Sequence, residues 1–131
     1  MASKSSKIDN SDRISLTLNS IYDTIENLID WNKNIDSADD FYASPGGMQL
    51  LAANCTLITA IGEGINRINR LAPEFLNTYF PDIPWVDIIG MRNRIAHGYF
   101  ELDADIVLDA VKNGIPPLKD AILKAIAIIK A

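Results

Sequence analysis

Apolar side chains recur every three or four residues over most of this chain, and this spacing constrains the fold more than any other feature of the sequence. A spacing of three and four residues lines the side chains along one face of an α-helix. We therefore expect a first amphipathic helix over about residues 11–35 and a second over about residues 46–70. The short apolar runs elsewhere fall inside a helical period, so no strand pattern competes with this interpretation.

Proline and glycine interrupt the helical pattern between these helices and after them. Residues 36–47 contain one proline and two glycines, which predicts a loop or a short turn. Residues 71–84 contain three prolines and predict a connector with one helical turn over residues 74–79.

Three further helices are expected in the remaining chain. Pro84 suits the first position of a third helix, which we expect to end near His97 with Gly98 as its left-handed stop. Residues 104–112 predict a fourth helix that ends at an Asn-Gly pair, and Pro117 is expected to open the fifth.

The expected fold class is all-α, an antiparallel bundle of about five helices joined by short connections. A length of 131 residues fits one domain, which we assign to residues 11–131, with residues 1–10 as a flexible tail. The amino terminus lacks the apolar core of a secretory signal. No apolar run approaches the roughly 20 residues that a membrane-spanning helix needs, so we expect no membrane partner.

Charge is distributed unevenly along the chain. The net charge of −5 argues against broad binding of polyanions, which needs a basic face. Any anion site is therefore expected in the central stretch, which holds four of the five arginines: Arg67, Arg70, Arg92 and Arg94. Cys55 is the only cysteine, which excludes an intramolecular disulfide and a cysteine-based zinc site and favours a reducing cytoplasm.

The stretch "GMRNRIAHGYF", residues 90–100, gathers the chain's only histidine with two arginines and Tyr99. Arg92 holds the position that would complete an apolar stripe, where an unpaired guanidinium is costly to bury. Asn93 lies one turn before His97, close enough to orient its imidazole. A glycine at position 90, in the middle of the expected helix, would let another backbone approach closely.

Purely structural roles account for the same residues in other ways. A histidine near a helix end is often a capping cation. Arg92 can pair with Glu63 on the second helix, or Glu63 can pair with Arg67 on its own helix. Tyr99 can be an ordinary boundary aromatic with its hydroxyl in water. The residues alone leave these alternatives open.

Three ordered elements resemble the HepT-like branch of the HEPN superfamily: "IGE" at residues 61–63, "PDIPW" at 81–85, and the Arg-x4-His-x-Tyr motif that Arg92, His97 and Tyr99 form. The likeness covers about residues 10–130. The resemblance implies a helical homodimer in which the two motifs face each other across a cleft. It also implies a metal-independent endoribonuclease, without a cofactor, that acts as the toxin of a toxin–antitoxin pair. The implied partner is a nucleotidyltransferase antitoxin that adenylylates the motif tyrosine.

RNA can be cleaved without a metal when its own 2′-hydroxyl attacks the adjacent phosphate, which needs a base, an acid and a cation. A symmetric dimer supplies two histidines, so His97 is expected to serve as base in one subunit and acid in the other. Arg92 suits the phosphate because guanidinium binds its oxygens in a bidentate fork. Asn93 would orient the imidazole, and Tyr99 would hold the phosphate or stack on a base. Two supporting positions are Glu63 and Arg94.

Two other classes of function compete with a nuclease. A catalytically weak HEPN module that binds nucleotide or RNA, and acts mainly as partner of a nucleotidyltransferase, fits the acidic net charge. It also fits the uncharged turn Asn54–Cys55–Thr56 before the "IGE" element, where relatives carry charges that would face RNA. A plain helical dimerisation protein leaves Arg92 unexplained.

Overall fold

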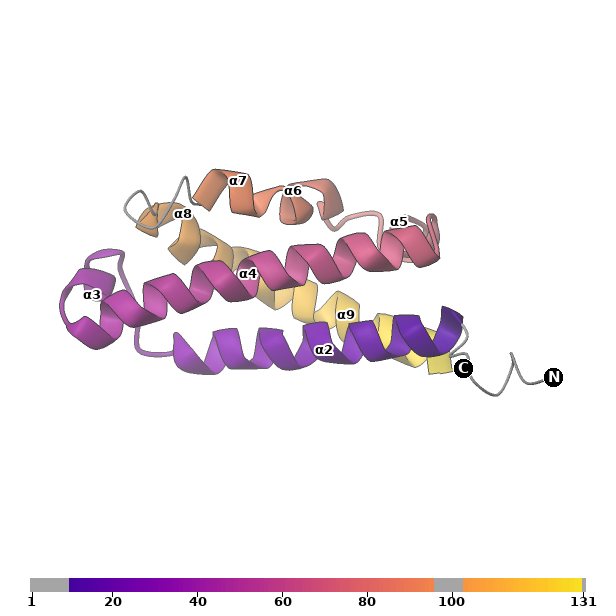
Figure 1. Ribbon diagram of the computed structural model, residues 1–131, viewed down its shortest axis with the longest axis horizontal. Coiled ribbons are helices and arrows are strands. Elements are labelled where there is room, and N and C mark those ends of the chain that lie inside the picture. Colours follow the sequence, from indigo (N-terminus) through magenta and orange to yellow (C-terminus); the bar gives the residue numbers. More distant parts are fainter. Residues whose placement is uncertain (1–9, 96–102, 131) are drawn as a thin grey trace, which may run out of the picture.

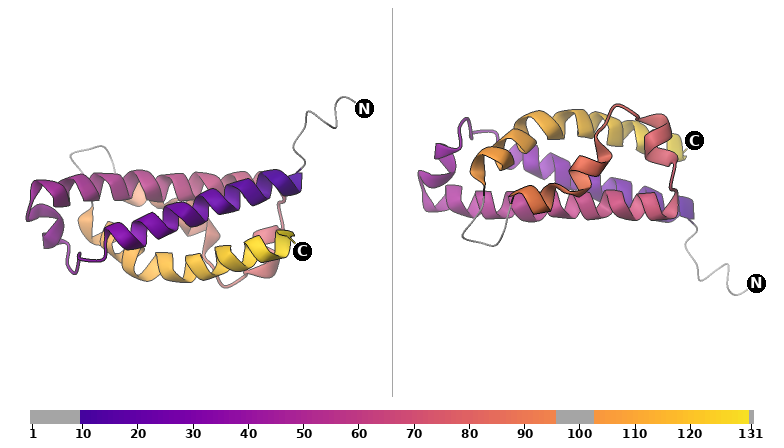
Figure 2. Two further views of the ribbon diagram at one scale, coloured as in Figure 1. Left: turned by 90° about the horizontal axis from the view of Figure 1, so that it is seen from below. Right: turned by 90° about the horizontal axis from the view of Figure 1, so that it is seen from above.

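Three long helices form the body of the protein: α2 (Asn10–Trp31), α4 (Pro45–Leu71) and α9 (Ile115–Lys130). The computed structural model describes residues 10–95 and 103–130, and all regular structure in these two ranges is helical. Helix α2 runs antiparallel to both α4 and α9 (Figure 1). The short helices α6 (Trp85–Ile89) and α7 (Met91–Ile95) cross above the space between α4 and α9 (Figure 2). The expected all-α antiparallel bundle is confirmed.

The core takes one apolar face from each long helix. Helix α4 lies at its centre and packs against α2, α3 (Asp39–Tyr42), α6, α7 and α8 (Ala104–Asp109). By length and composition alone α4 could also cross a membrane. The central position of α4 accounts for its apolar composition, because one face of this helix is buried in the core through Leu51, Ile58, Ile61, Ile65 and Ile68.

A buried pair of asparagines joins α2 to α4. The Nδ2 of Asn32 donates to the Oδ1 of Asn54 at 2.8 Å, and the Nδ2 of Asn54 donates back to the Oδ1 of Asn32 at 2.7 Å. These residues are only 1% and 0% exposed, and the Nζ of Lys112 donates to the backbone carbonyl of Asn32 at 3.0 Å. Asn54, the first residue of the uncharged turn before the "IGE" element, therefore belongs to the core.

Helix α3, four residues long, lies inside the segment expected to be a loop or a short turn, so that prediction missed a short helix there. The carboxylate of Asp40 accepts hydrogen bonds from the backbone N–H groups of Asp36 at 2.8 Å and Ser37 at 3.1 Å. These bonds order the turn that precedes α3 and hold the pKa of the Asp40 carboxyl below its ordinary value. The short helix expected in the next connector is confirmed as α5 (Phe75–Tyr79).

The third expected helix is wrong as one continuous helix, because it breaks at Gly90 between α6 and α7. Gly90 has φ −81° and ψ −1°, a ψ about 40° away from the helical value. Glycine favours such a break because it is among the weakest helix formers. The turn re-aims α7, so Arg92 is exposed rather than part of the buried stripe that contains Trp85 and Ile95.

The fourth and fifth expected helices are joined, which corrects the predicted stop between them. Helix α8 continues through a π-helix, η2 (Ala110–Gly114), into α9. The Asn-Gly pair that was expected to end a helix lies inside η2. Pro116 and Pro117 occupy the first turn of α9, where a missing N–H group is tolerated.

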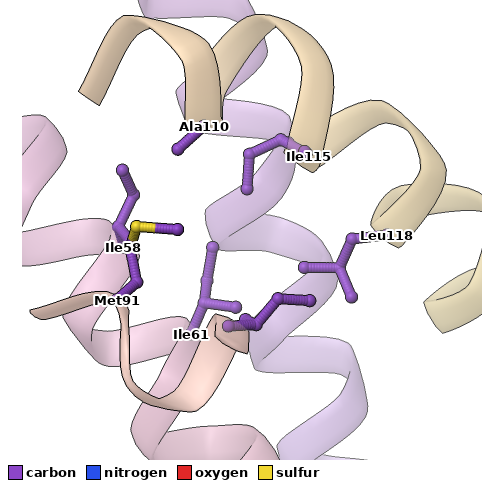
Figure 3. A pocket seen from close by; sticks show the side chains of 8 residues that line it. Ile58, Ile61, Met91, Ala110, Ile115 and Leu118 are labelled. Atoms are coloured by element: carbon purple, nitrogen blue, oxygen red, sulfur yellow. The ribbon is translucent and has the colours of Figure 1, made fainter. Parts of the chain in front are cut away.

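A small apolar cavity of about 50 Å³ lies where α6 and α7 cross above α4 and α9. Its walls include Ile58 from α4, Met91 from α7, Ala110 and Gly114 from η2, and Leu118 from α9. Figure 3 shows these side chains converging from the separate helices. The π-helical turn therefore borders a space that is not completely filled.

Helices α4 and α6 touch backbone to backbone at Gly62, which is buried. A Cβ added to Gly62 would lie 3.1 Å from the carbonyl oxygen of Ile88 and 3.3 Å from the Cα of Ile89. At Gly114, in contrast, an added Cβ would meet nothing within 4 Å. The two glycines therefore differ: only Gly62 is required by a close approach.

We predict opposite effects of alanine at these two glycines. Gly62→Ala should lower the free energy of unfolding by about 1–3 kcal/mol, because the backbone of α6 must move. Gly114→Ala should raise it by about 0.5–1 kcal/mol, because alanine is the better helix former and finds open space. Urea denaturation followed by circular dichroism measures both values. Equal changes in the two variants would contradict the close approach at Gly62.

Candidate functional site

A polar pocket of about 210 Å³ lies between α4 and the α6–α7 turn. We call it the α4–α7 pocket. Three residues singled out from the sequence, Glu63, Arg92 and Asn93, share it. Its complete lining is Thr59, Gly62, Glu63 and Asn66 from α4, with Ile89, Gly90, Arg92 and Asn93 from the crossing segment.

The backbone fixes both walls of this pocket. On α4, residues three or four positions apart point the same way, which places Thr59, Glu63 and Asn66 along one wall. On the other wall, the N–H of Gly90 donates to the carbonyl of Val86 at 3.0 Å, and the N–H of Asn93 donates to the carbonyl of Gly90 at 3.1 Å. The turn that presents Arg92 and Asn93 is thus tied to α6 on one side and to α7 on the other.

Arg92 is exposed at the pocket and has no carboxylate partner. Within residues 10–95 and 103–130 three ion pairs form, and the cation in each is a lysine: Lys33–Asp30, Lys119–Glu26 and Lys124–Asp120. The structural alternatives in which Glu63 pairs with Arg92 or with Arg67 are therefore not formed. An exposed guanidinium beside a polar pocket keeps its charge and its five donors for an anion.

Two predicted site residues, His97 and Tyr99, lie outside the described residues, and their roles stay predictions. The described residues on either side of them are joined, since the N–H of Asp103 donates to the carbonyl of Ile95 at 3.0 Å. Ile95 is fully buried, and the Oδ1 of Asp103 caps α8 by accepting from the N–H of Ile106 at 3.1 Å. The segment that carries the histidine and tyrosine therefore begins and ends at two anchored positions.

One residue predicted for the site does not line the α4–α7 pocket, and two residues that were not predicted do line it. Arg94 is exposed on α7 but does not line the α4–α7 pocket. Thr59 and Asn66 do line it and were missed from the sequence. Each lies one turn from Glu63, so helical spacing around the "IGE" element is the signal that would have found them.

Among residues 10–95 and 103–130, no other element comes close to Gly90, and the approach of a second copy expected there stays a prediction. Of the described residues, an added Cβ would meet the carbonyl oxygens of Val86 at 3.4 Å and Asp87 at 3.9 Å, both in the preceding helix α6. Within the chain, a close backbone approach is made at Gly62. Val86, one turn before Gly90, is 82% exposed, which leaves an apolar side chain beside the pocket open to solvent.

The lone cysteine is a poor candidate for a nucleophile. Burial raises the pKa of the Cys55 thiol, so the thiol stays protonated at neutral pH. It borders a wider hollow of about 520 Å³ along α4 that shares Thr59 and Glu63 with the α4–α7 pocket. In the part of the chain that the structure describes, no group of three or more histidine, cysteine or acidic side chains could hold a metal ion.

We predict that Arg92 contributes almost nothing to stability. Arg92→Ala should change the free energy of unfolding by less than about 0.5 kcal/mol, because the side chain is exposed and unpaired. Ile95→Ala, in the same helix, should lower it by about 2–5 kcal/mol because it empties a core position. Urea denaturation of the two variants gives the comparison. A loss above about 1 kcal/mol in Arg92→Ala that vanishes in a Glu63→Ala background would restore the structural pair.

Comparison with known proteins places these residues in a family context. The family described as "Ribonuclease HepT-like" matches residues 21–125, which include the whole pocket lining. A Methanocaldococcus jannaschii protein named "Gamma-glutamylcyclotransferase and putative RNase" is 34% identical over 111 residues, 85% of this chain and 46% of that protein. Another protein of that organism, named "Putative RNase", is 29% identical over 102 residues, 76% of this chain and 86% of its own.

A Thermococcus cleftensis protein named "Probable ribonuclease HepT" is 33% identical over 57 residues, 44% of this chain and 52% of that protein. The chain thus spans less than half of the first of these three relatives and most of the second. No solved structure matches the chain at comparable significance.

Proposed function

This chain belongs to the HepT-like ribonuclease family, and from that premise we propose that it is a ribonuclease whose active site is the α4–α7 pocket. The observation that carries the proposal is Arg92, an exposed guanidinium at a polar pocket with no carboxylate committed to it. The family and the names of the relatives support ribonuclease activity. In finer terms, we propose a cytoplasmic, metal-independent endoribonuclease that acts as the toxin of a toxin–antitoxin pair.

The proposed reaction is attack of an RNA 2′-hydroxyl on the adjacent phosphorus. The bond from the 2′-oxygen to phosphorus forms, the bond from phosphorus to the 5′-oxygen breaks, and a 2′,3′-cyclic phosphate and a 5′-hydroxyl result. His97 of one subunit takes the proton of the 2′-hydroxyl, and His97 of the other gives a proton to the leaving oxygen. Arg92 binds the non-bridging oxygens, where negative charge grows. Asn93 orients the imidazole, and Glu63 on the opposite wall repels the phosphate towards Arg92.

We predict that RNA cleavage persists in EDTA and leaves 2′,3′-cyclic phosphate ends. His97→Ala should lower the rate about 10²–10⁴-fold, since that is the usual contribution of one acid–base group. Arg92→Ala should lower it about 10²–10³-fold through lost stabilisation of the phosphate charge. Gel analysis of labelled RNA provides the rates, with Arg13→Ala on α2 as a control cation that should leave the rate unchanged.

The outcomes separate the proposal from its rival. Parent-like cleavage by His97→Ala would make the histidine structural. Binding of RNA without cleavage by the parent protein would favour the catalytically weak module that acts mainly as partner of a nucleotidyltransferase.

A homodimer is part of the proposal because one chain holds one histidine and the reaction needs two. Its support is the outer side of the α6–α7 segment, which we call the Val86 stripe, where Val86 and Asn93 are exposed and Gly90 between them is half-buried. Val86 is 82% exposed, and burial of an apolar side chain against a second copy would stabilise association. We therefore propose a two-fold axis close to this stripe.

We predict that Val86→Asp weakens the dimer without unfolding the chain. A carboxylate placed at an apolar contact must be desolvated or leave it, so the dissociation constant should rise at least tenfold. Sedimentation at several concentrations measures this change, and circular dichroism checks folding. Leu123→Asp on α9, also an exposed apolar position, is the matched control and should stay dimeric. A parent protein that is monomeric at all concentrations would refute the dimer and the two-histidine mechanism.

We also propose that a small nucleotidyltransferase adenylylates Tyr99 and thereby inhibits the nuclease. AMP attached there would bring negative charge close to the phosphate site. One like-charge contact at about 4 Å and an effective dielectric constant of about 20 opposes binding by roughly 4 kcal/mol, or about a thousandfold.

We predict an adduct of AMP mass after co-expression with such an enzyme, together with loss of RNA cleavage. Intact mass spectrometry detects the adduct. It should disappear in Tyr99→Phe and persist in Tyr42→Phe and Tyr79→Phe, which remove two exposed tyrosines elsewhere in the chain. An adduct that survives Tyr99→Phe would assign the modification to another residue.

A further inference from the structure

The last two turns of α4 carry the repeat "INRINR", residues 65–70, which the proposed reaction does not use. Helix geometry divides this repeat between inside and outside. Ile65 and Ile68 are fully buried, whereas Arg67 and Arg70 are exposed. The isoleucines therefore hold α4 in the core, and both arginines face solvent.

Neither arginine is committed to a carboxylate. Glu63 lies four residues before Arg67 on α4, the spacing at which helical ion pairs form, and Glu74 lies just beyond the end of α4, directly before α5. Yet no arginine takes part in an ion pair within 4.0 Å anywhere in residues 10–95 and 103–130. Two guanidinium groups with free donors therefore lie one turn apart on this end of α4.

This end of α4 is continuous with the α4–α7 pocket. Asn66 lines the pocket, and Arg70 follows it by four residues, on the same side of the helix and about 6 Å further along the axis. A nucleotide chain that leaves the pocket along α4 in this direction would meet the arginines next. The direction is away from α7 and towards α5 (Figure 1).

An exposed aromatic cluster lies at the same end of the bundle, on α5 and just after it. Tyr79 is 55% exposed, and its ring centroid lies 5.4 Å from that of Phe75 and 6.5 Å from that of Phe80, with tilted planes. The two phenylalanine rings, which are half-buried, thus contact the tyrosine ring at tilted angles. A supported, exposed ring offers a surface on which an unpaired base can stack.

We propose that this α4–α5 end is a secondary subsite for single-stranded RNA, which holds nucleotides outside the cleaved bond. Arg67 and Arg70 bind phosphates, and Tyr79 stacks on a base. Single-stranded RNA is favoured over a duplex because only unpaired bases expose faces for stacking. The subsite rests on the proposed function in that RNA is the substrate, and it adds which nucleotides are held and where.

The test measures binding of RNA that cannot be cleaved. Fluorescence anisotropy with fully 2′-O-methylated single strands of about 4 and about 12 nucleotides compares a pocket-sized RNA with one that reaches the subsite. The combined variant Arg67→Ala/Arg70→Ala should bind the long RNA about tenfold more weakly or worse. Its slope of log affinity against log salt should fall by about 1–2, and its binding of the short RNA should match the parent's.

Matched variants separate contact from general charge. Lys33→Ala/Lys124→Ala removes two exposed cations, one just after α2 and one on α9, and should leave the long RNA bound as in the parent protein. Tyr79→Ala should weaken the long RNA about fivefold or more, and Tyr79→Phe should restore most of that affinity because stacking needs only the ring. Circular dichroism confirms that each variant is folded.

Equal binding of long and short RNA by the parent, or equal loss in the two double variants, would overturn the subsite. If the parent cleaves unmodified RNA and the Arg67 and Arg70 variant shows no increased KM for long RNA, the subsite is wrong and the nuclease stands. If binding depends on these arginines but unmodified RNA stays intact, the nuclease is wrong and the subsite stands.

Discussion

The backbone contact between α4 and α6 at Gly62 determines the position of the α4–α7 pocket. Side chains normally hold two packed helices about 8–10 Å apart, and a buried glycine permits the near end of that range. With α6 held against α4 in this way, the turn at Gly90 places Arg92 and Asn93 opposite Glu63 and Asn66. A larger residue at position 62 would shift one wall of the pocket against the other. A displacement of about 1 Å can lower a reaction rate about a hundredfold, so in the proposed active site this contact would constrain catalysis as well as packing.

Lysines and arginines form different interactions in this chain, whose net charge is −5. The ion pairs of the described residues use lysines, while Arg67, Arg70, Arg92 and Arg94 have no ion pair there. Exposed ion pairs contribute only about 0–1 kcal/mol each, so leaving the arginines unpaired sacrifices little stability. Packing specificity comes instead from uncharged groups such as the Asn32–Asn54 pair, whose amides satisfy each other in the core. The arginines are thus available for phosphate groups, the anions for which a planar guanidinium is best suited.

Helical spacing predicted the long helices and most of the core, because burial of an apolar stripe is a property of each segment by itself. The break at Gly90 was missed because apolar residues continue on both sides of it, at Trp85, Ile88 and Ile95, and a change in ψ leaves no mark on that spacing. The η2 segment was missed because a π-turn accommodates an Asn-Gly pair that would otherwise end a helix. Of the site, Glu63, Arg92 and Asn93 were found from ordered motifs, whereas Thr59 and Asn66 look like ordinary exposed helix residues. The contacts of Gly62 and Asn54 needed the fold, since their partners are distant in sequence.

If the proposed dimer forms at the Val86 stripe, its two-fold symmetry also explains how the secondary subsites of both chains can bind a single RNA strand. The two-fold axis would pass near the α4–α7 pockets, and the two copies of the secondary subsite would extend away from the axis in opposite directions. An RNA strand bound across the axis would then contact one subsite on each side of the cleaved bond. Its 5′-to-3′ direction would be opposite in the two subsites. Contacts from guanidinium to phosphate and from a tyrosine ring to a base tolerate this reversal, because neither reads the direction of the backbone. Hydrogen bonds to base edges would not tolerate it. The secondary subsite consists of two arginines and an aromatic ring. It therefore has a composition with which a symmetric dimer could bind a polymer that has a direction.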